Sequence, residues 1–304
     1  MAEKSMCRTW SRLIHTCLLA LGLVAGSTGE ASDWPQWRGP QRDGIWRETD
    51  TVEQIPSAGL PVRWRIPIEG GYAGPAVVGG RVFVTDYVRR DGELANNPND
   101  RTLLAGNERV LCLDATTGQV LWKHEYDCPY SISYAAGPRC TPTVHDGRVY
   151  VVGAEGNLLC LEASTGKLLW QKDFKRDYAA PTPIWGFCGH PLVVDDLLIC
   201  LVGGEGSVAV AFDRVTGEER WRALSASEQG YCPPTLMEAA GQSVRAVRDL
   251  LDALKVSCRL ADYELPMENI PKLVAGAMRQ SRLFVPNPRD LTEADVKAIF
   301  EEAY

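Results

Sequence analysis

The chain has 304 residues, of which 45% are apolar and 23% charged, so it is long enough to bury one large core or two smaller ones. Its formal net charge is −7, and no run of Lys or Arg follows residue 12. Because affinity for nucleic acid comes mainly from clustered basic side chains, this composition argues against nucleic acid as a partner.

The N-terminal 31 residues have the pattern of a secretory signal peptide. Basic residues begin the segment, residues 13–24 are apolar but too few to cross a bilayer comfortably, and residues 29–31 place small side chains at a cleavage position. We therefore expect export to the periplasm or the cell exterior, with a mature chain that starts near Ser32 and has no transmembrane segment. A buried N-terminal helix is the alternative.

Three segments of the chain are nearly identical in pattern. They are residues 111–122 (LCLDATTGQVLW), 159–170 (LCLEASTGKLLW) and 210–221 (VAFDRVTGEERW). Their closing tryptophans, Trp122, Trp170 and Trp221, are 48 and 51 residues apart. This period is typical of propeller blades or solenoid units.

The second unit shows how one repeat forms strands. Its apolar and β-branched residues have the spacing of strands, and Asp146-Gly147 between two of them is a strong hairpin signal. Gly166 can adopt a positive φ at no steric cost and turn the chain into a last strand that ends on Trp170. Four strands in about 50 residues predict a propeller blade, with the tryptophan packed between neighbouring blades.

The same pattern occurs earlier, at residues 74–85, with Trp64 as the closing residue of a preceding blade. The gap from Trp64 to Trp122 widens to 58 residues. The excess falls in residues 89–107, which are rich in Asn, Asp and Gly, so we expect an exposed loop there. Such loops carry function more often than strands do, and a plain insertion is the alternative.

These residues carry a family resemblance. Residues 33–44 (DWPQWRGPQRDG) and the repeated Asp/Glu-x-x-Thr-Gly-x-x-x-Trp closures resemble the PQQ-like β-propeller repeat proteins, relatives of the propeller lipoprotein of outer-membrane assembly. The resemblance covers about residues 34–235 and implies the fold without implying an activity. Quinoprotein dehydrogenases add a vicinal cysteine pair and a calcium site. No two cysteines are adjacent in this sequence, which argues against quinone binding.

The ten cysteines favour core positions over a disulfide framework. Cys112 and Cys160 occupy the same position of successive repeats, as do Cys140 and Cys188, which is typical of a small apolar core residue. Cys128 with Cys140 is the one pair that the sequence offers as a candidate bridge. The sequence has no C-x-x-C motif, and its four histidines are scattered, so it gives no support for a zinc site.

The repeat pattern breaks after the third unit. A fourth blade begins at residues 230–235 and does not continue, because the composition from Leu236 onward is helical. Helices are predicted over about residues 239–254, 270–280 and 292–303. In the last of these, Thr292 and Asp295 form a capping box. One face of that helix is predicted to hold Val296, Ile299, Phe300 and Ala303.

This tail resembles a second family. Residues 268–275, 287–289 (Asn-Pro-Arg) and 292–304 are similar to the C-terminal end of the iron-containing alcohol dehydrogenases, over about residues 237–304. That family binds a dinucleotide on a glycine-rich domain and holds a metal with one aspartate and three histidines, all upstream of such a tail. Residues 236–304 contain no histidine. Their carboxylates, including Asp249, Asp252 and Asp262, are best interpreted as a solvated helix face.

The predicted fold class is therefore mainly β. A signal peptide (residues 1–31) precedes an incomplete propeller of about three to four PQQ-like blades (residues 32–235). A small α-helical segment (residues 236–304) follows.

The favoured function is that of an exported binding or scaffold module with no complete catalytic site. Its partner would be another protein or a cell-envelope component, contacted through residues 87–106 and 126–139. No catalytic, cofactor-binding or metal-ligating residue is assigned, and no cofactor is expected.

Two alternatives remain open. One is an iron-containing, metal- and NAD-dependent alcohol dehydrogenase represented only by its C-terminal fragment. It conflicts with the position of Gly203-Gly204-Glu205-Gly206 inside a propeller strand pair. The other is a chimeric or truncated chain, in which a propeller cut after three blades exposes open edges that can self-associate.

Overall fold

The computed structural model of the protein describes residues 32–49, 51–95, 97–236, 260–263, 265–279 and 291–304. The predicted signal peptide, the first predicted helix of the tail and the Asn-Pro-Arg motif at residues 287–289 lie outside the described residues.

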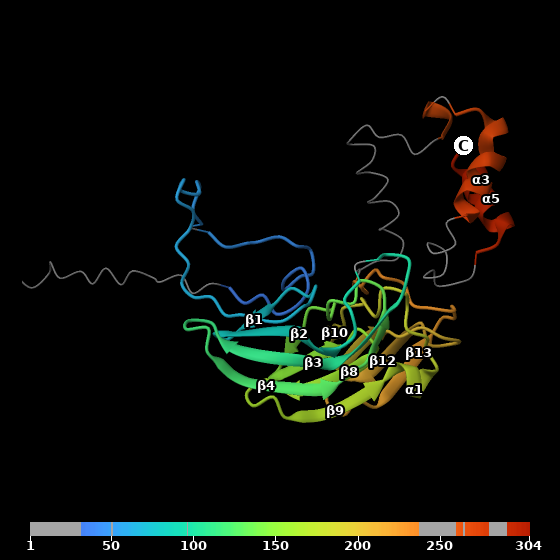
Figure 1. Ribbon diagram of the computed structural model, residues 1–304. Coiled ribbons are helices and arrows are strands. Elements are labelled where there is room, and N and C mark those ends of the chain that lie inside the picture. The colour runs from blue at the N-terminus through green and yellow to red at the C-terminus, as the bar shows by residue number, and fades with distance from the viewer. Residues whose placement is uncertain (1–31, 50, 96, 237–259, 264, 280–290) are drawn as a thin grey trace, which may run out of the picture. The chain divides into compact units, whose positions relative to one another are not determined.

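Three antiparallel sheets follow one another along the chain (Figure 1). The first contains β1 (Ala76–Val78), β2 (Arg81–Asp91), β3 (Thr102–Asp114) and β4 (Val120–Asp127), with β5 (Tyr130–Ile132) paired to the start of β3. The second contains β6 (Thr143–His145), β7 (Arg148–Val152), β8 (Asn157–Glu162) and β9 (Leu168–Asp173). The third contains β10 (Leu192–Val194), β11 (Leu197–Leu201), β12 (Ala209–Asp213) and β13 (Glu219–Ala223). We call these sheets the first, second and third blade, and they confirm the predicted partial propeller.

The repeated tryptophans fall at matching places in the three blades. Trp122 lies opposite Cys112, Trp170 opposite Cys160, and Trp221 opposite Ala211. In each blade the register of the strand pair shifts immediately after the residue that lies opposite the tryptophan. Such a bulge bends the strand, so the repeat fixes the outer strand's shape as well as its sequence.

Trp122 and Trp170 join their own blades to the next one, and Trp64 makes the same contact with the first blade. The indole Nε1 groups donate hydrogen bonds to backbone oxygens in the following Thr-Gly turn: Trp64 to Ala115 at 2.9 Å, Trp122 to Ala163 at 3.0 Å and Trp170 to Arg214 at 3.4 Å. The rings lie against the turn glycines Gly118, Gly166 and Gly217, each with φ of +74°. A side chain at these glycines would overlap the indole, so only glycine fits.

Trp64 makes this contact from a segment that is not a strand. Residues 61–69 are extended but belong to none of the three sheets. The predicted closing residue of a preceding blade is therefore in place, while the described residues before it form no blade. Residues 230–235, the predicted start of a fourth blade, likewise contain no strand.

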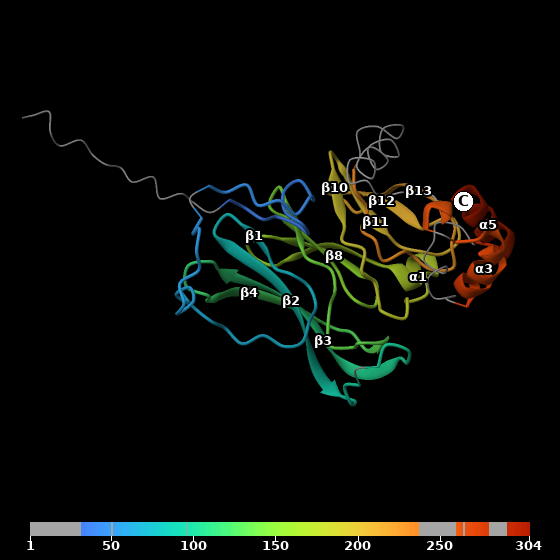
Figure 2. The same ribbon diagram turned by 90° about the horizontal axis from the view of Figure 1, so that it is seen from above.

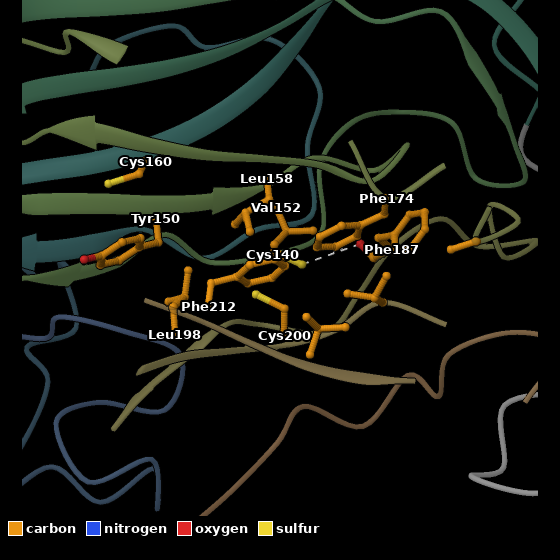
Figure 3. Close-up of a cluster of buried hydrophobic side chains, with 13 residues drawn as sticks. Cys140, Tyr150, Val152, Leu158, Cys160, Phe174, Phe187, Leu198, Cys200 and Phe212 are labelled. Atoms are coloured by element: carbon orange, nitrogen blue, oxygen red, sulfur yellow. Dashed lines mark hydrogen bonds between the residues drawn. The ribbon is translucent and has the colours of Figure 1, made fainter. Parts of the chain in front are cut away.

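Apolar layers fill the spaces between blades. One layer joins the first blade to the second and includes Phe83, Val149 and Leu161. The other joins the second blade to the third, where side chains of β7 and β8 meet those of β11 and β12 (Figure 3). Alternation along each strand sends successive side chains to opposite faces, so the middle blade contributes to both layers.

All seven cysteines among the described residues are free thiols, and four of them lie in these cores. Cys112, Cys140, Cys160 and Cys200 are buried within the two layers. The candidate bridge between Cys128 and Cys140 is wrong in this structure, because Cys128 belongs to a separate apolar cluster. The Cys140 thiol instead lies 3.5 Å from the Phe187 carbonyl. Burial raises the pKa of the Cys140 thiol, which makes it unreactive.

About half of the predicted loop at residues 89–107 is strand. β2 continues to Asp91 and β3 begins at Thr102, so the two strands form a long hairpin beyond the rest of the blade. The pairing of β5 with the start of β3 supports this extension. Only residues 92–101 connect the two strands, which makes the insertion an ordered part of the first blade.

Residues 33–44, which we call the strap, cross the inner strands of all three blades. Figure 2 shows this blue segment beside β1 and close to β10. Its backbone and side-chain contacts are Trp34 with Val77 (2.7 and 2.9 Å), Val144 N with Pro35 O (2.8 Å), Arg42 Nη1 with Pro191 O (3.0 Å) and Arg42 Nη2 with His190 O (3.2 Å). The Asp-Trp-Pro-Gln motif thus has a structural use that the sequence did not reveal.

The described C-terminal residues form two of the three predicted helices. α3 (Ile270–Met278) and α5 (Glu293–Glu302) follow two short 3-10 turns, η1 (Leu260–Tyr263) and η2 (Met267–Asn269), and they pack through Ile270, Val274 and Val296. Thr292 and Asp295 form the capping box as predicted. Ile299 is exposed rather than on the buried face, because the contact with α3 is a narrow stripe. No helix among the described residues is long and apolar enough to span a membrane.

Candidate functional site

The two segments predicted to make contacts, residues 87–106 and 126–139, come together at one end of the first blade. We call the surface formed by these segments and residues 180–188 the loop face. Arg101 ties it together, because its guanidinium donates to Ser131 O at 2.6 Å and to Thr182 O at 2.7 Å. Hydrogen bonds from Arg101 therefore join the three segments of the loop face into one surface.

A further contact joins the connection between β2 and β3 to the region before the third blade. The Trp185 Nε1 group donates to Pro98 O at 3.3 Å, and the Trp185 ring lies 5.0 Å from the ring of Tyr231. Neither Arg101 nor Trp185 was singled out in the sequence. Both act over more than 80 residues of chain, and no local pattern indicates such a contact.

An open hollow of about 260 Å³ lies in the loop face. Its lining consists of Glu69, Gly70, Tyr87, Val88, Arg89, Leu94, Leu104, Ala135 and Ala136. The two predicted segments therefore line the same hollow. Leu94 is 51% exposed within this lining. An exposed leucine in a hollow offers an apolar contact to a partner.

A buried carboxyl group supports the hollow from below. Glu108 accepts hydrogen bonds from Tyr126 OH, from Tyr130 OH at 2.5 Å and from Ala154 N at 2.8 Å. The Tyr130 ring stacks on the ring of Tyr87, with centroids 3.9 Å apart, and Tyr87 lines the hollow. Packing and hydrogen bonds therefore fix the floor.

Burial raises the pKa of the Glu108 carboxyl, while the three hydrogen bonds that it accepts act in the opposite direction. Burial also raises the pKa of the Tyr87 hydroxyl, which donates to Cys128 O at 3.0 Å. Both groups take part in the packing and hydrogen bonds of the floor.

A second buried carboxylate holds the other side of the loop face. Glu155 accepts from Ser131 N at 2.6 Å, from Lys175 Nζ at 2.8 Å and from Thr182 Oγ1 at 2.8 Å. These bonds connect β5, α1 (Phe174–Tyr178) and the loop after it. The buried charge is therefore paired and hydrogen-bonded, as its burial requires.

The hollow has the chemistry of a binding site. Its lining offers apolar side chains and one charge of each sign, Glu69 and Arg89, and none of these nine lining residues is a histidine, serine or cysteine. Among the residues that the structure describes, no group of three or more His, Cys, Asp or Glu side chains could hold a metal ion. The arrangement fits docking of an apolar side chain with charges at its margin.

Two family profiles match the chain. The profile described as outer membrane protein assembly factor BamB matches residues 106–254, and the profile of the Fe-containing alcohol dehydrogenase family, C-terminal, matches residues 210–304. The two matches share residues 210–254. No curated protein matches the chain.

Several solved structures are similar in part. A europium-containing methanol dehydrogenase is 19% identical, with a TM-score of 0.39, over 66% of this chain and 33% of that one. The quinohemoprotein alcohol dehydrogenase from Comamonas testosteroni is 24% identical, with a TM-score of 0.41, over 72% and 31%. BamB from Moraxella catarrhalis is 21% identical, with a TM-score of 0.28, over 50% and 46%.

The chain spans about a third of the length of the two dehydrogenases. The profile matches agree with the strand repeats seen in the three blades and with the helices at the C-terminal end. The chain thus contains propeller repeats that match the BamB profile over residues 106–254, and its C-terminal segment matches the profile of the Fe-containing alcohol dehydrogenase family, C-terminal.

Proposed function

We propose that the chain is an exported binding module, whose loop face docks another protein of the cell envelope in the periplasm or outside the cell. The observation that carries this proposal is the hollow with its fixed floor and its exposed Leu94. A preformed site of mixed polarity loses little conformational entropy on binding, so such a surface favours association.

Two further observations support the proposal. The first 31 residues have the signal-peptide pattern, which favours export. The matching profile is described as an outer membrane protein assembly factor, which favours a protein partner at the envelope.

Site-specific crosslinking tests the proposal. A photoreactive amino acid at Leu94 of the full chain should give one defined adduct in envelope extract. The same group at Leu121, which is 47% exposed on β4 away from the hollow, should give none. The adduct is identified by mass spectrometry, and the change Val88→Asp in the lining should remove it because a charge in the hollow opposes apolar docking. Identical adducts at both positions, or none at Leu94, would overturn the proposal.

The alternative function is that of a dehydrogenase of the iron-containing alcohol dehydrogenase class. The match over residues 210–304 favours it. Calorimetric titration of the full chain with a nicotinamide cofactor, and separately with Zn²⁺ or Fe²⁺, distinguishes the two functions. Binding of both cofactor and metal would support the dehydrogenase, while a binding module takes up neither.

A further inference from the structure

We propose that a second copy of this chain docks its third blade against the first blade, with Trp221 entering the turn that Trp64 now fills, so that two copies close a ring of six blades. This inference goes beyond the binding function of the loop face. It depends on the two ends of the row of blades, which lie outside the hollow.

The first of the two docking surfaces is the outer face of the third blade, which we call the donor end because it supplies Trp221. By strand register, Ile199, Ala209 and Trp221 occupy the positions of Tyr150, Leu158 and Trp170. Those residues of the second blade are in the layer that the third blade covers, whereas Ile199 and Ala209 are only half-buried. Trp221 itself is 41% exposed. The third blade therefore has the same kind of face that the second blade uses to contact a following blade.

The second docking surface is the face of the first blade that Trp64 covers, which we call the acceptor end because it receives an indole. This face carries Val84, Leu111 and Leu113, which are buried under Trp64 and Ile66. The Trp64 indole donates to Ala115 O at 2.9 Å and lies against Gly118, as Trp122 and Trp170 do in the next turns. The acceptor site is thus complete and takes an indole in the same way as the other two.

In the structure, residues 61–68 occupy the acceptor end, and few contacts attach them to it. Residues 61–68 make none of the strand pairs of a blade, and Val62 and Ile68 beside Trp64 are exposed. Residues 61–68 pack through two side chains, Trp64 and Ile66, and the first backbone bonds to the blade follow at Glu69 N with Asp86 (2.8 Å) and Gly70 O with Tyr87 N (2.8 Å), whereas each blade covers its neighbour with a whole sheet. A complete blade buries more apolar area than one extended segment, so it can replace residues 61–68.

The sequence of the occupant matches the donor. Residues 63–65 and residues 220–222 are both Arg-Trp-Arg. Along β13, side chains alternate, so Trp221 lies on one face and both of its neighbouring arginines on the other. The acceptor already holds the tryptophan of one Arg-Trp-Arg segment, and the second would arrive with the rest of the third blade behind it.

The count of blades agrees with closure. Each copy supplies three blades. Two copies give about six, within the range of about four to eight at which propellers close. The two contacts would be identical and related by a twofold axis, because each copy offers one donor and one acceptor. Trp64 of the same chain competes for the acceptor, so the dimer should form as the concentration rises.

The test is the mass of the full chain in solution, measured by analytical ultracentrifugation from about 1 to 100 μM, since dimers respond to concentration. The wild type should shift toward twice the chain mass of 33.4 kDa. Trp221→Glu should weaken the dimer by at least about a hundredfold, because it places a charge where an aromatic side chain anchors the interface. The matched control is Leu169→Glu on β9, where Leu169 is 42% exposed away from both ends.

A second variant changes the equilibrium in the opposite direction. Trp64→Ala removes the internal competitor and should tighten the dimer at least about tenfold, which corresponds to a loss of about 1.4 kcal/mol of competing contact. Circular dichroism confirms that each variant is folded. Three results would overturn the proposal: a wild type that stays monomeric, an equal effect of Trp221→Glu and Leu169→Glu, or masses that grow past the dimer.

Discussion

At the scale of single residues, the turn glycines decide whether the blades can meet. Gly166 has φ of +74°, a backbone conformation that is costly for residues with a Cβ atom, and it lies directly under the Trp122 ring. The conformation alone would be tolerated at some cost. The contact with the indole adds a second requirement, because there is no room for a methyl group.

The change Gly166→Ala should therefore lower the free energy of unfolding by about 3 kcal/mol, from backbone strain and overpacking together. A Cβ atom there would lie 2.4 Å from Cε3 of Trp122. Gly147→Ala is the matched control, since Gly147 has φ of +70° and nothing within 4 Å of the added carbon. It should cost only about 1 kcal/mol of strain. Denaturant unfolding measures both, and equal losses would contradict the packing argument.

At the scale of elements, α5 shows how a local signal sets a boundary. Thr292 accepts a hydrogen bond from Asp295 N at 3.2 Å, and the Asp295 carboxylate accepts one from Thr292 N at 2.8 Å. These two bonds satisfy donors that a helix start leaves free. The helix therefore begins where the sequence predicted it to begin.

The change Thr292→Ala should weaken α5 by about 1 kcal/mol, because the first turn loses its cap. Amide hydrogen exchange should then be faster at Val296, whose backbone N–H donates to Thr292 O at 3.1 Å within the first turns. Thr292→Ser keeps the hydroxyl and serves as the control. Unchanged exchange in Thr292→Ala, or the same acceleration in Thr292→Ser, would show that the cap does not hold the helix.

At the scale of the whole molecule, His190 joins three parts of the fold. Its Nδ1 accepts from Thr141 N at 2.8 Å, and its ring stacks on the ring of Trp37 in the strap, with centroids 5.0 Å apart. Burial lowers the pKa of His190 to about 4, and the nearby Arg42 guanidinium acts in the same direction. The folded protein therefore needs this imidazole to be neutral.

Stability should fall as the pH falls, because the unfolded state binds a proton that the folded state excludes. The stabilisation is fully present above 6.5, the ordinary pKa of an unfolded histidine, and is lost as the pH falls toward 4. At about 1.36 kcal/mol per pKa unit, the loss reaches about 3 kcal/mol. The variant His190→Gln should flatten this slope in unfolding experiments between these pH values, while the exposed His145→Gln should not. An unchanged slope in His190→Gln would assign the pH dependence to other groups.

The sequence predicted those parts of the fold that depend on neighbours in the chain. Turn glycines, hairpin signals and the capping box act over a few residues, so the blades and α5 followed from the sequence. The strap did not, because Arg42 finds its acceptors at residues 190 and 191. The hollow followed only in part: its two segments were identified, but the predicted loop is a hairpin supported by β5 and tied down by Arg101.

The reach of the strap has a consequence for synthesis. Arg42 and its acceptors are separated by 148 and 149 residues, so the strap leaves the ribosome long before its last contact exists. At about 5–20 residues per second, roughly 7 to 30 seconds pass between the two events. During that interval the nascent chain cannot reach its final state, because the strap lacks the carbonyl groups that Arg42 contacts.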